Sequence, residues 1–297
     1  LPIFKLEDEL PTLIDETREN VHGEEEPYLI FNNVGAWPVQ RTADRKQDAV
    51  YIEVWPPYDR YASIAQLIRD ARTYAKDDKS TILAAYLKPF REGKREKALP
   101  AAKLLMGSIV SNGATHLLTG ENQTALTQGY YSDYTKFSDS EAEAIRRYYD
   151  YMIRYENLFF DPELQDVTMT HTGWDNYEYQ CTSHKVSSYG EAGKIWMILR
   201  EKDYRKCIYL LNLCGQSEDY WNEGKEEPNI QKDIKFTVQV DTPVEKICFS
   251  TPDGENMDAI ELSFTERATK TGKFIDFTVP SLNYWTTIWI DTRKETI

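Results

Sequence analysis

Apolar stripes at helical spacing alternate with short, almost wholly apolar runs in the first half of the chain, which predicts helices alternating with buried strands. The predicted helices span residues 6–21, 60–76, 101–111 and a segment that begins at the Ser138–Glu141 capping box. The predicted strands span residues 28–31, 51–55, 81–87 and 115–121. This order favours an α/β unit with a parallel sheet and helices outside it.

Beyond about residue 165 the pattern changes to short strands without helices between them. These strands are predicted at residues 195–199, 207–211, 234–240, 246–249, 274–279 and 285–290. Turn residues such as Asp253-Gly254 separate them, which is typical of an antiparallel β-sandwich. We therefore expect two domains, an α/β domain over residues 1–165 and an all-β domain over residues 166–297.

Charge and composition narrow the possible partners. The net charge of −14 argues against nucleic acid and anionic membranes, because both would repel the chain. Neutral sugars are not repelled, and 20 Tyr and 7 Trp residues supply rings that can stack on them, although rings also fill ordinary cores. No run approaches the ~20 apolar residues of a membrane span.

Cysteine and histidine spacings do not suggest a metal site, so we expect neither a metal nor a cofactor. The four cysteines are Cys181, Cys207, Cys214 and Cys248. Disulfides are possible, but free thiols are the favoured interpretation.

The candidate chemistry centres on the strand that contains Glu53. Side chains alternate along a strand, so Tyr51, Glu53 and Trp55 share a face, and Pro56-Pro57 ends the strand just beyond. A carboxyl held against aromatic rings loses hydration, which favours its protonated form and suits it to donate a proton. The alternative is a core glutamate bonded to neighbouring backbone.

Further polar residues lie at or near the ends of the predicted strands. Catalytic groups of parallel sheets gather at the carboxyl ends of the strands, so these residues are expected to lie near Glu53. The expected substrate-binding residues are Asn32, Asn33, Tyr51, Trp55, Tyr86 and Glu121. Turn formation by the two asparagines and loop anchoring by Glu121 are the alternatives.

Three stretches together resemble glycoside hydrolase family 66, the dextranases and cycloisomaltooligosaccharide glucanotransferases. They are residues 51–55, the tyrosine-rich segment 129–156, and the second half with Asp203-Tyr204-Arg205, Leu211-Asn212-Leu213 and residues 280–285. The resemblance implies the second half of a (β/α)₈ barrel followed by a Greek-key β-sandwich. It also implies a bacterial extracellular or periplasmic enzyme that cleaves α-1,6-glucan (dextran, isomaltooligosaccharides) with retention, and Glu53 matches its acid/base position.

Two departures from the family refine this expectation. The family's nucleophile is an aspartate on an earlier barrel strand, which would lie before Leu1, so we expect the chain to need the N-terminal half of the barrel as a partner. The short connection after Leu87 lacks the carbohydrate-binding insert of the cyclising enzymes, which favours endo-hydrolysis, a dextranase. A glucanotransferase, a non-catalytic α-glucan-binding module and a structural protein with a merely buried Glu53 remain alternatives.

Overall fold

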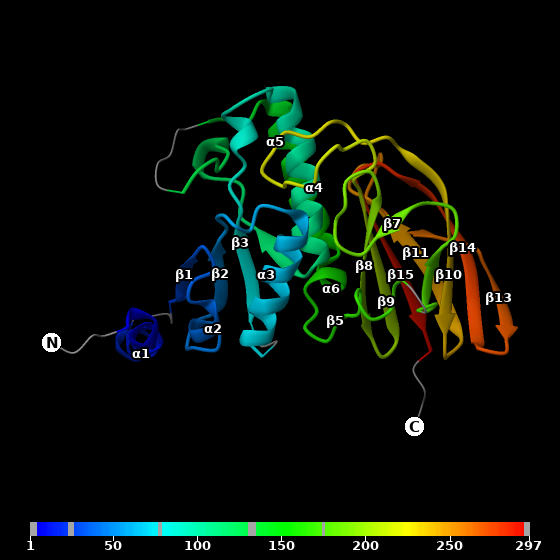
Figure 1. The fold of residues 1–297 in the computed structure, drawn as a ribbon, viewed down its shortest axis with the longest axis horizontal. Helices are drawn as coiled ribbons and strands as arrows, with labels where there is room; N and C mark the ends of the chain where they lie inside the picture. Colours follow the sequence, from blue (N-terminus) through cyan, green and yellow to red (C-terminus); the bar gives the residue numbers. More distant parts are fainter. Residues whose placement is uncertain (1–4, 23–26, 77–78, 130–134, 174–175, 294–297) are drawn as a thin grey trace.

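The computed structural model describes residues 5–22, 27–76, 79–129, 135–173 and 176–293. Its first half contains a parallel four-stranded sheet in the order β1-β2-β3-β4 (Figure 1). The strands are β1 (Ile30–Val34), β2 (Ala49–Glu53), β3 (Ser80–Ala84) and β4 (Ala114–His116). The α/β character predicted for this half is therefore confirmed.

The helices of this half are α1 (Leu6–Asn20), α2 (Val39–Thr42), α3 (Tyr61–Tyr74), η1 (Lys88–Phe90), η2 (Arg95–Lys97), α4 (Ala98–Ser111), η3 (Glu121–Gln123), α5 (Asp139–Arg154) and α6 (Glu156–Phe159). Of these, α1, α3, α4 and α5 follow the predicted stripes closely, whereas the short α2, α6 and 3₁₀ turns were not predicted. Both hydrogen bonds of the capping box are present at the start of α5: Ser138 Oγ accepts from Glu141 N, and the Glu141 side chain accepts from Ser138 N. Gly113, with φ +91°, follows α4 as the left-handed residue that ends a helix without a Cβ penalty.

The two faces of the parallel sheet differ. Val50, Ile52 and Val54 lie on the face that packs into the core with α3 and α4. On the opposite face Asn32, Tyr51 and Ile82 stand side by side in register, and their side chains are exposed or half-buried. The sheet is open in the part of the chain that the structure describes, so the half-barrel remains a prediction.

The second half is all-β, as expected. Its strands are β5 (Gln165–Asp166), β6 (Tyr179–Cys181), β7 (Val186–Ser187), β8 (Ile195–Lys202), β9 (Arg205–Asn212), β10 (Gln231–Val240), β11 (Val244–Ser250), β12 (Ile260–Glu261), β13 (Phe264–Thr269), β14 (Gly272–Leu282) and β15 (Trp285–Thr292). They form a four-stranded sheet, β13-β14-β10-β6, and a seven-stranded sheet, β12-β11-β15-β9-β8-β5 with β7 beside β8. Apart from the parallel β7–β8 pair, the pairings are antiparallel. The boundary between residues 165 and 166 stays a prediction.

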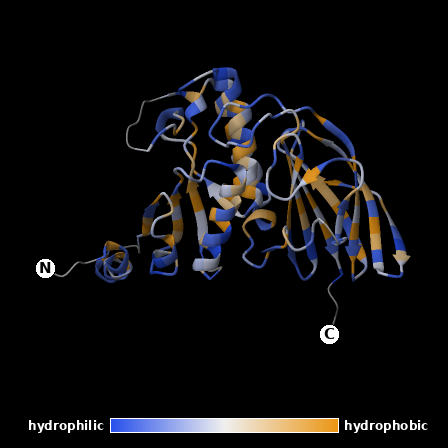
Figure 2. Ribbon diagram, in the orientation of Figure 1, coloured by the Kyte–Doolittle hydropathy of each residue, from blue (hydrophilic) through white to orange (hydrophobic). Residues whose placement is uncertain are grey.

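The seven-stranded sheet is buried on both faces. Met197 and Leu199 of β8 point into a core shared with the four-stranded sheet, whereas Trp196 and Ile198 join the core of the α/β half. Hydrophobic colouring runs along α4 and on strands of the β half in Figure 2. The α/β and β halves therefore meet through a continuous apolar interior.

Some local predictions were wrong. The strand predicted at residues 28–31 is β1 at Ile30–Val34, because Tyr28 is 89% exposed and the pairing begins beyond it. The strand predicted at residues 115–121 ends at His116. The sequence also places Leu10, Leu13, Ile14 and Val21 on one apolar stripe of the first predicted helix, but Leu10 and Ile14 are buried whereas Leu13 and Val21 are exposed.

The four cysteines are free thiols, as favoured. Among the described residues, no helix combines the length and the hydrophobicity that crossing a bilayer requires.

Candidate functional site

Glu53 is the last residue of β2 and lies at the carboxyl end of the parallel sheet. Its side chain is almost wholly buried, with 4% of the residue exposed. Trp55 follows it on the same chain, and Tyr86 follows the neighbouring strand β3. The Trp55 and Tyr86 rings lie 6.1 Å apart, centroid to centroid, at an interplanar angle of 57°. The structure thus brings the predicted residues Glu53, Trp55 and Tyr86 together, with Tyr51 earlier on β2.

The hydroxyl groups of Tyr51 and Tyr86 belong to the same polar cluster as Glu53. Burial, the neighbouring Tyr51 and a hydrogen bond with Glu53 raise the pKa of Tyr86 well above its ordinary value. Burial also raises the pKa of Tyr51, against the effect of its hydrogen bond with Tyr86. Both phenols therefore keep their protons near neutrality, and Glu53 faces an O–H donor that can fix its orientation.

Gly129 completes this group, although it is not among the predicted site residues. A Cβ placed on Gly129 would lie 2.3 Å from Oε1 of Glu53 and 2.9 Å from the Trp55 ring. The segment before it is fixed by backbone hydrogen bonds from Leu87 N to Leu126 O and from Leu126 N to Leu118 O, of 3.1 and 2.8 Å. The available signal was the glycine that opens the aromatic loop 129–134, of which residues 130–134 lie outside the described residues.

One polar atom of the group has no hydrogen-bond partner in the part of the chain that the structure describes. Nε1 of Trp55 is buried without a hydrogen bond, although an indole N–H normally donates one when it is buried. The Trp55 ring that carries this atom lies beside Tyr86 and Gly129, so the indole is enclosed within the group.

The two asparagines have different environments. Asn32 is exposed on the open face of the sheet, next to Tyr51 in register. Asn33 points to the other face and is fully buried; its Nδ2 donates to Tyr51 O at 2.8 Å and its Oδ1 accepts from Thr42 Oγ1 at 2.6 Å. The prediction that Asn33 contacts a substrate is therefore wrong, because its amide is used to hold β1, β2 and α2 together. The role of Asn32 stays a prediction.

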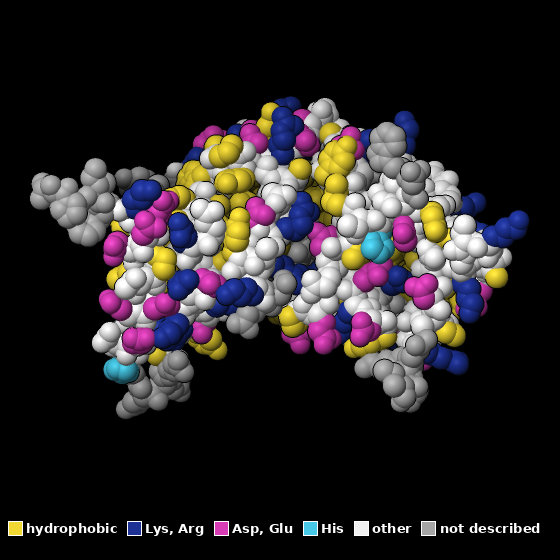
Figure 3. Space-filling model, turned by 60° about the horizontal axis from the view of Figure 1, so that its bottom comes forward, with side chains coloured by type: hydrophobic (Ala, Val, Ile, Leu, Met, Phe, Trp, Pro, Cys, Tyr) yellow, Lys and Arg dark blue, Asp and Glu magenta, His cyan; other side chains and the backbone are white. Residues whose placement is uncertain are grey.

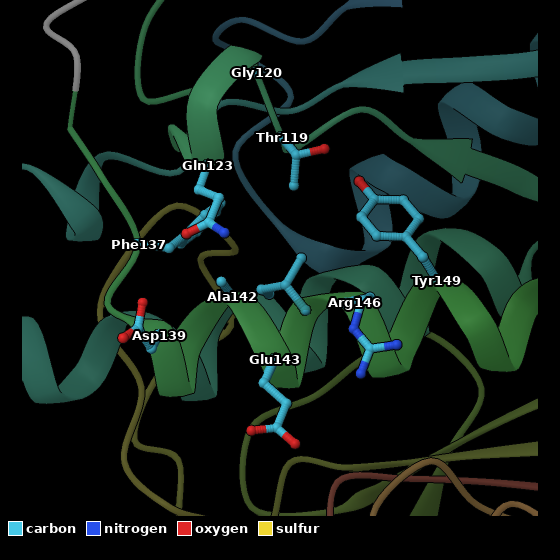
Figure 4. A pocket seen from close by; sticks show the side chains of 10 residues that line it. Thr119, Gly120, Gln123, Phe137, Asp139, Ala142, Glu143, Arg146 and Tyr149 are labelled. Atoms are coloured by element: carbon cyan, nitrogen blue, oxygen red, sulfur yellow. The ribbon is translucent and has the colours of Figure 1, made fainter.

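Glu121 lies apart from the strand ends. It is exposed in η3, several residues beyond the end of β4, and its loop borders a different cavity of about 500 Å³. Figure 4 shows this cavity between Thr119, Gly120 and Gln123 on one side and Asp139, Ala142, Glu143, Arg146 and Tyr149 of α5 on the other. None of the predicted site residues lines it. The strand-end argument for Glu121 was wrong because β4 is shorter than its apolar run suggested.

A metal-binding cluster of three or more His, Cys, Asp or Glu side chains is not found among the described residues. What the group at Glu53 can supply is a carboxyl with restricted hydration, two phenolic hydroxyls and an indole ring, a set suited to proton transfer beside a hydroxylated ligand.

Comparison with known proteins identifies related chains. The model of the family described as "Glycosyl hydrolase family 66" matches residues 3–289. Two cycloisomaltooligosaccharide glucanotransferases from Niallia circulans are 28% and 26% identical over 193 and 191 residues, which is 64% and 63% of this chain. The matched part is 19% of each relative, so the chain spans about a fifth of their length.

A solved structure has the same fold over nearly the whole chain. The crystal structure of a Paenibacillus sp. cycloisomaltooligosaccharide glucanotransferase complexed with cycloisomaltoheptaose aligns with a TM-score of 0.85 and 15% identity. The alignment covers 96% of this chain and 59% of that one. At this identity the likeness concerns the fold.

Proposed function

Since the chain belongs to glycosyl hydrolase family 66, we propose that Glu53 is the acid/base of an enzyme that cleaves α-1,6-glucosidic bonds in dextran with retention. The observation that carries the proposal is the environment of this carboxyl. It lies at the carboxyl end of a central parallel strand, held between Trp55, Tyr86 and the backbone at Gly129. Carboxyl ends of parallel strands are where such folds place their chemistry.

The proposed chemistry assigns one role to each group. Glu53 gives a proton to the glycosidic oxygen as the bond breaks, and later takes a proton from the incoming water. Tyr86 holds the carboxyl in place through its hydroxyl, and Trp55, whose residue is half-buried, offers its ring to the sugar. A retaining enzyme needs a second carboxylate about 5–5.5 Å away as nucleophile. In this proposal that carboxylate belongs to a part of the enzyme outside these 297 residues.

Hydrolysis is proposed ahead of transfer because the connection between β3 and α4 is short. Between β3 and α4 the chain runs only through residues 85–97, with two short 3₁₀ turns, which leaves no space for an inserted module. The second candidate is glucanotransfer, and the names of the similar proteins from Niallia circulans favour it. Product analysis on dextran separates the two: linear isomaltooligosaccharides support hydrolysis, and cyclic products support transfer.

The decisive experiment is Glu53→Gln in the full-length gene product, with Glu121→Gln as the matched control. Loss of a general acid should lower the rate of dextran cleavage by roughly 10²–10⁴-fold. The exposed Glu121 lies outside the group, so its amide should leave the rate unchanged. Near-wild-type activity of Glu53→Gln would refute the assignment.

Calorimetric titration tests the non-catalytic alternative. Isomaltooligosaccharides should bind the wild type and Glu53→Gln with similar affinity if Glu53 acts on the leaving group. Tight binding without any cleavage by the full-length product would favour a glucan-binding module.

A further inference from the structure

A second cavity lies at the opposite edge of the parallel sheet from Glu53, at the amino ends of β3 and β4. Its volume is about 330 Å³, and it lies between the α/β half and β8. The polar side chains that matter for its chemistry are Arg72, Lys79, Thr81, Thr115, Asp161 and Arg200. Figure 3 brings this underside forward and shows Lys and Arg side chains in and beside the hollow at the middle of the molecule.

The charges around this cavity are predominantly positive. Lys79, Arg200 and the carboxylate of Asp161 line it together with Arg72, which donates to the backbone oxygens of Pro162 and Leu164, in a protein whose net charge is −14. Although burial opposes ionisation of Asp161, its hydrogen bond from Lys202 lowers the pKa of this carboxyl. Asp161 is thus an ionised group that is paired with Lys202 and also within electrostatic reach of Arg200, whose charge helps to lower the same pKa.

Arg200 is the unusual member of this set. It is 1% exposed, and its terminal nitrogens donate to the carbonyl oxygens of Phe159 and Leu164 at 2.5 and 3.2 Å. Its Nε is buried without a hydrogen-bond partner, and no ion pair of Arg200 occurs among the described residues. A buried N–H without an acceptor is costly, so a ligand oxygen that reached this guanidinium would stabilise the fold.

Two further observations point to the same cavity. Oγ1 of Thr81 is also buried without a partner, although Thr81 lines the cavity. Gly113 leaves room for the guanidinium, because a Cβ there would lie 3.0 Å from the carbon and both terminal nitrogens of Arg200. The guanidinium is therefore fixed against the start of β4, while the Lys79 amine has no ion pair or hydrogen bond in the described part of the chain.

We propose that this cavity binds a small oxyanion, such as phosphate, sulfate or a carboxylate. The anion would be held by Arg200 and Lys79, with the hydroxyls of Thr81 and Thr115 as further donors. Because Arg200 comes from β8 and Lys79 from the α/β half, the anion links the two halves. Its effect is on stability, and it is independent of the role proposed for Glu53.

The test is thermal unfolding of the 297-residue chain, titrated with inorganic phosphate against sodium chloride at equal ionic strength. A ligand that binds only the folded state raises the melting temperature saturably with its free concentration. We expect this rise with phosphate, and no comparable rise with chloride. Isothermal titration with phosphate should give the same dissociation constant, and sulfate and acetate then rank the anion classes.

Two variants with a matched control decide whether the effect belongs to this cavity. Lys79→Gln should weaken phosphate binding about tenfold, as expected for losing one charge-assisted hydrogen bond. Lys273→Gln removes the same charge from an exposed site on β14 and should leave binding unchanged. Thr81→Val removes the hydroxyl that has no partner in the protein's described part. It should also weaken binding, because the anion would accept a hydrogen bond from this hydroxyl. Equal responses of all three variants and the wild type would overturn the proposal, because only a general salt effect would remain.

Discussion

Gly129 offers a sharp test of the group around Glu53, because its backbone lies against the carboxyl. In Gly129→Ala the new Cβ would be 2.3 Å from Oε1 of Glu53, and ordinary contacts of this kind are 3.4–4 Å. The carboxyl or the loop must therefore move by about 1 Å. A misplacement of ~1 Å can cost ~10²-fold in rate when a catalytic group is involved. We expect kcat/KM of the full-length gene product on dextran to fall by about that factor.

The control for this experiment is Gly254→Ala. At Gly254 the nearest atom to a new Cβ is Asn256 O at 3.3 Å, so little has to move and the rate should stay near that of the wild type. Thermal unfolding of both variants separates a displaced carboxyl from a lost fold. If Gly129→Ala folds and keeps the wild-type kcat/KM, the reasoning that Glu53 acts from this position is refuted.

Two predictions concern stability. His116 is fully buried and burial lowers its pKa to about 4, so the neutral ring favours folding above pH 6.5 and this contribution is lost as the pH falls towards 4. Between pH 7.5 and 5 the free energy of unfolding of the wild type should fall by about 2 kcal/mol through this group, and urea unfolding of His116→Gln should not show this fall. The same pH dependence in His116→Gln and the wild type would contradict the prediction. Gly107→Ala should destabilise by ~1–3 kcal/mol, because the Cβ would lie 2.8 Å from Leu211 and 3.1 Å from Trp285. An exposed helical glycine would instead gain up to ~1 kcal/mol from the same change, so a rise in the urea midpoint would show that α4 is not tightly packed.

The elements with strong periodicity were predictable from the sequence. On α3, Tyr61, Ile64 and Ile68 recur at helical spacing and all three are fully buried. The edge strand β1 was misplaced because one of its faces is not covered, so the apolar signal that marks a buried strand is weak there. Glu121 was misplaced for a related reason, since an apolar run does not show where hydrogen bonding to the next strand stops.

The site was predictable as far as local geometry fixes it. Strand alternation alone places Tyr51, Glu53 and Trp55 on one face, and the parallel order of the strands brings Tyr86 to the same edge. Asn33 could not be judged, because whether an amide faces a ligand or the interior depends on partners such as Thr42. Contacts between distant segments, as between Gly129 and Glu53, leave no periodic signal in the sequence.

A sheet with apolar side chains on both sides limits how this protein can change during evolution. Trp196 and Met197 are neighbours on β8, yet Trp196 packs in the core next to α4 and α5, and Met197 packs in the core between the two β-sheets. A single-residue insertion in β8 would move the side chains that follow it to the opposite face of the sheet, so the packing of both cores would be disturbed together. The two halves should therefore be inherited as a pair, with length variation confined to the hairpins and surface loops that connect the strands.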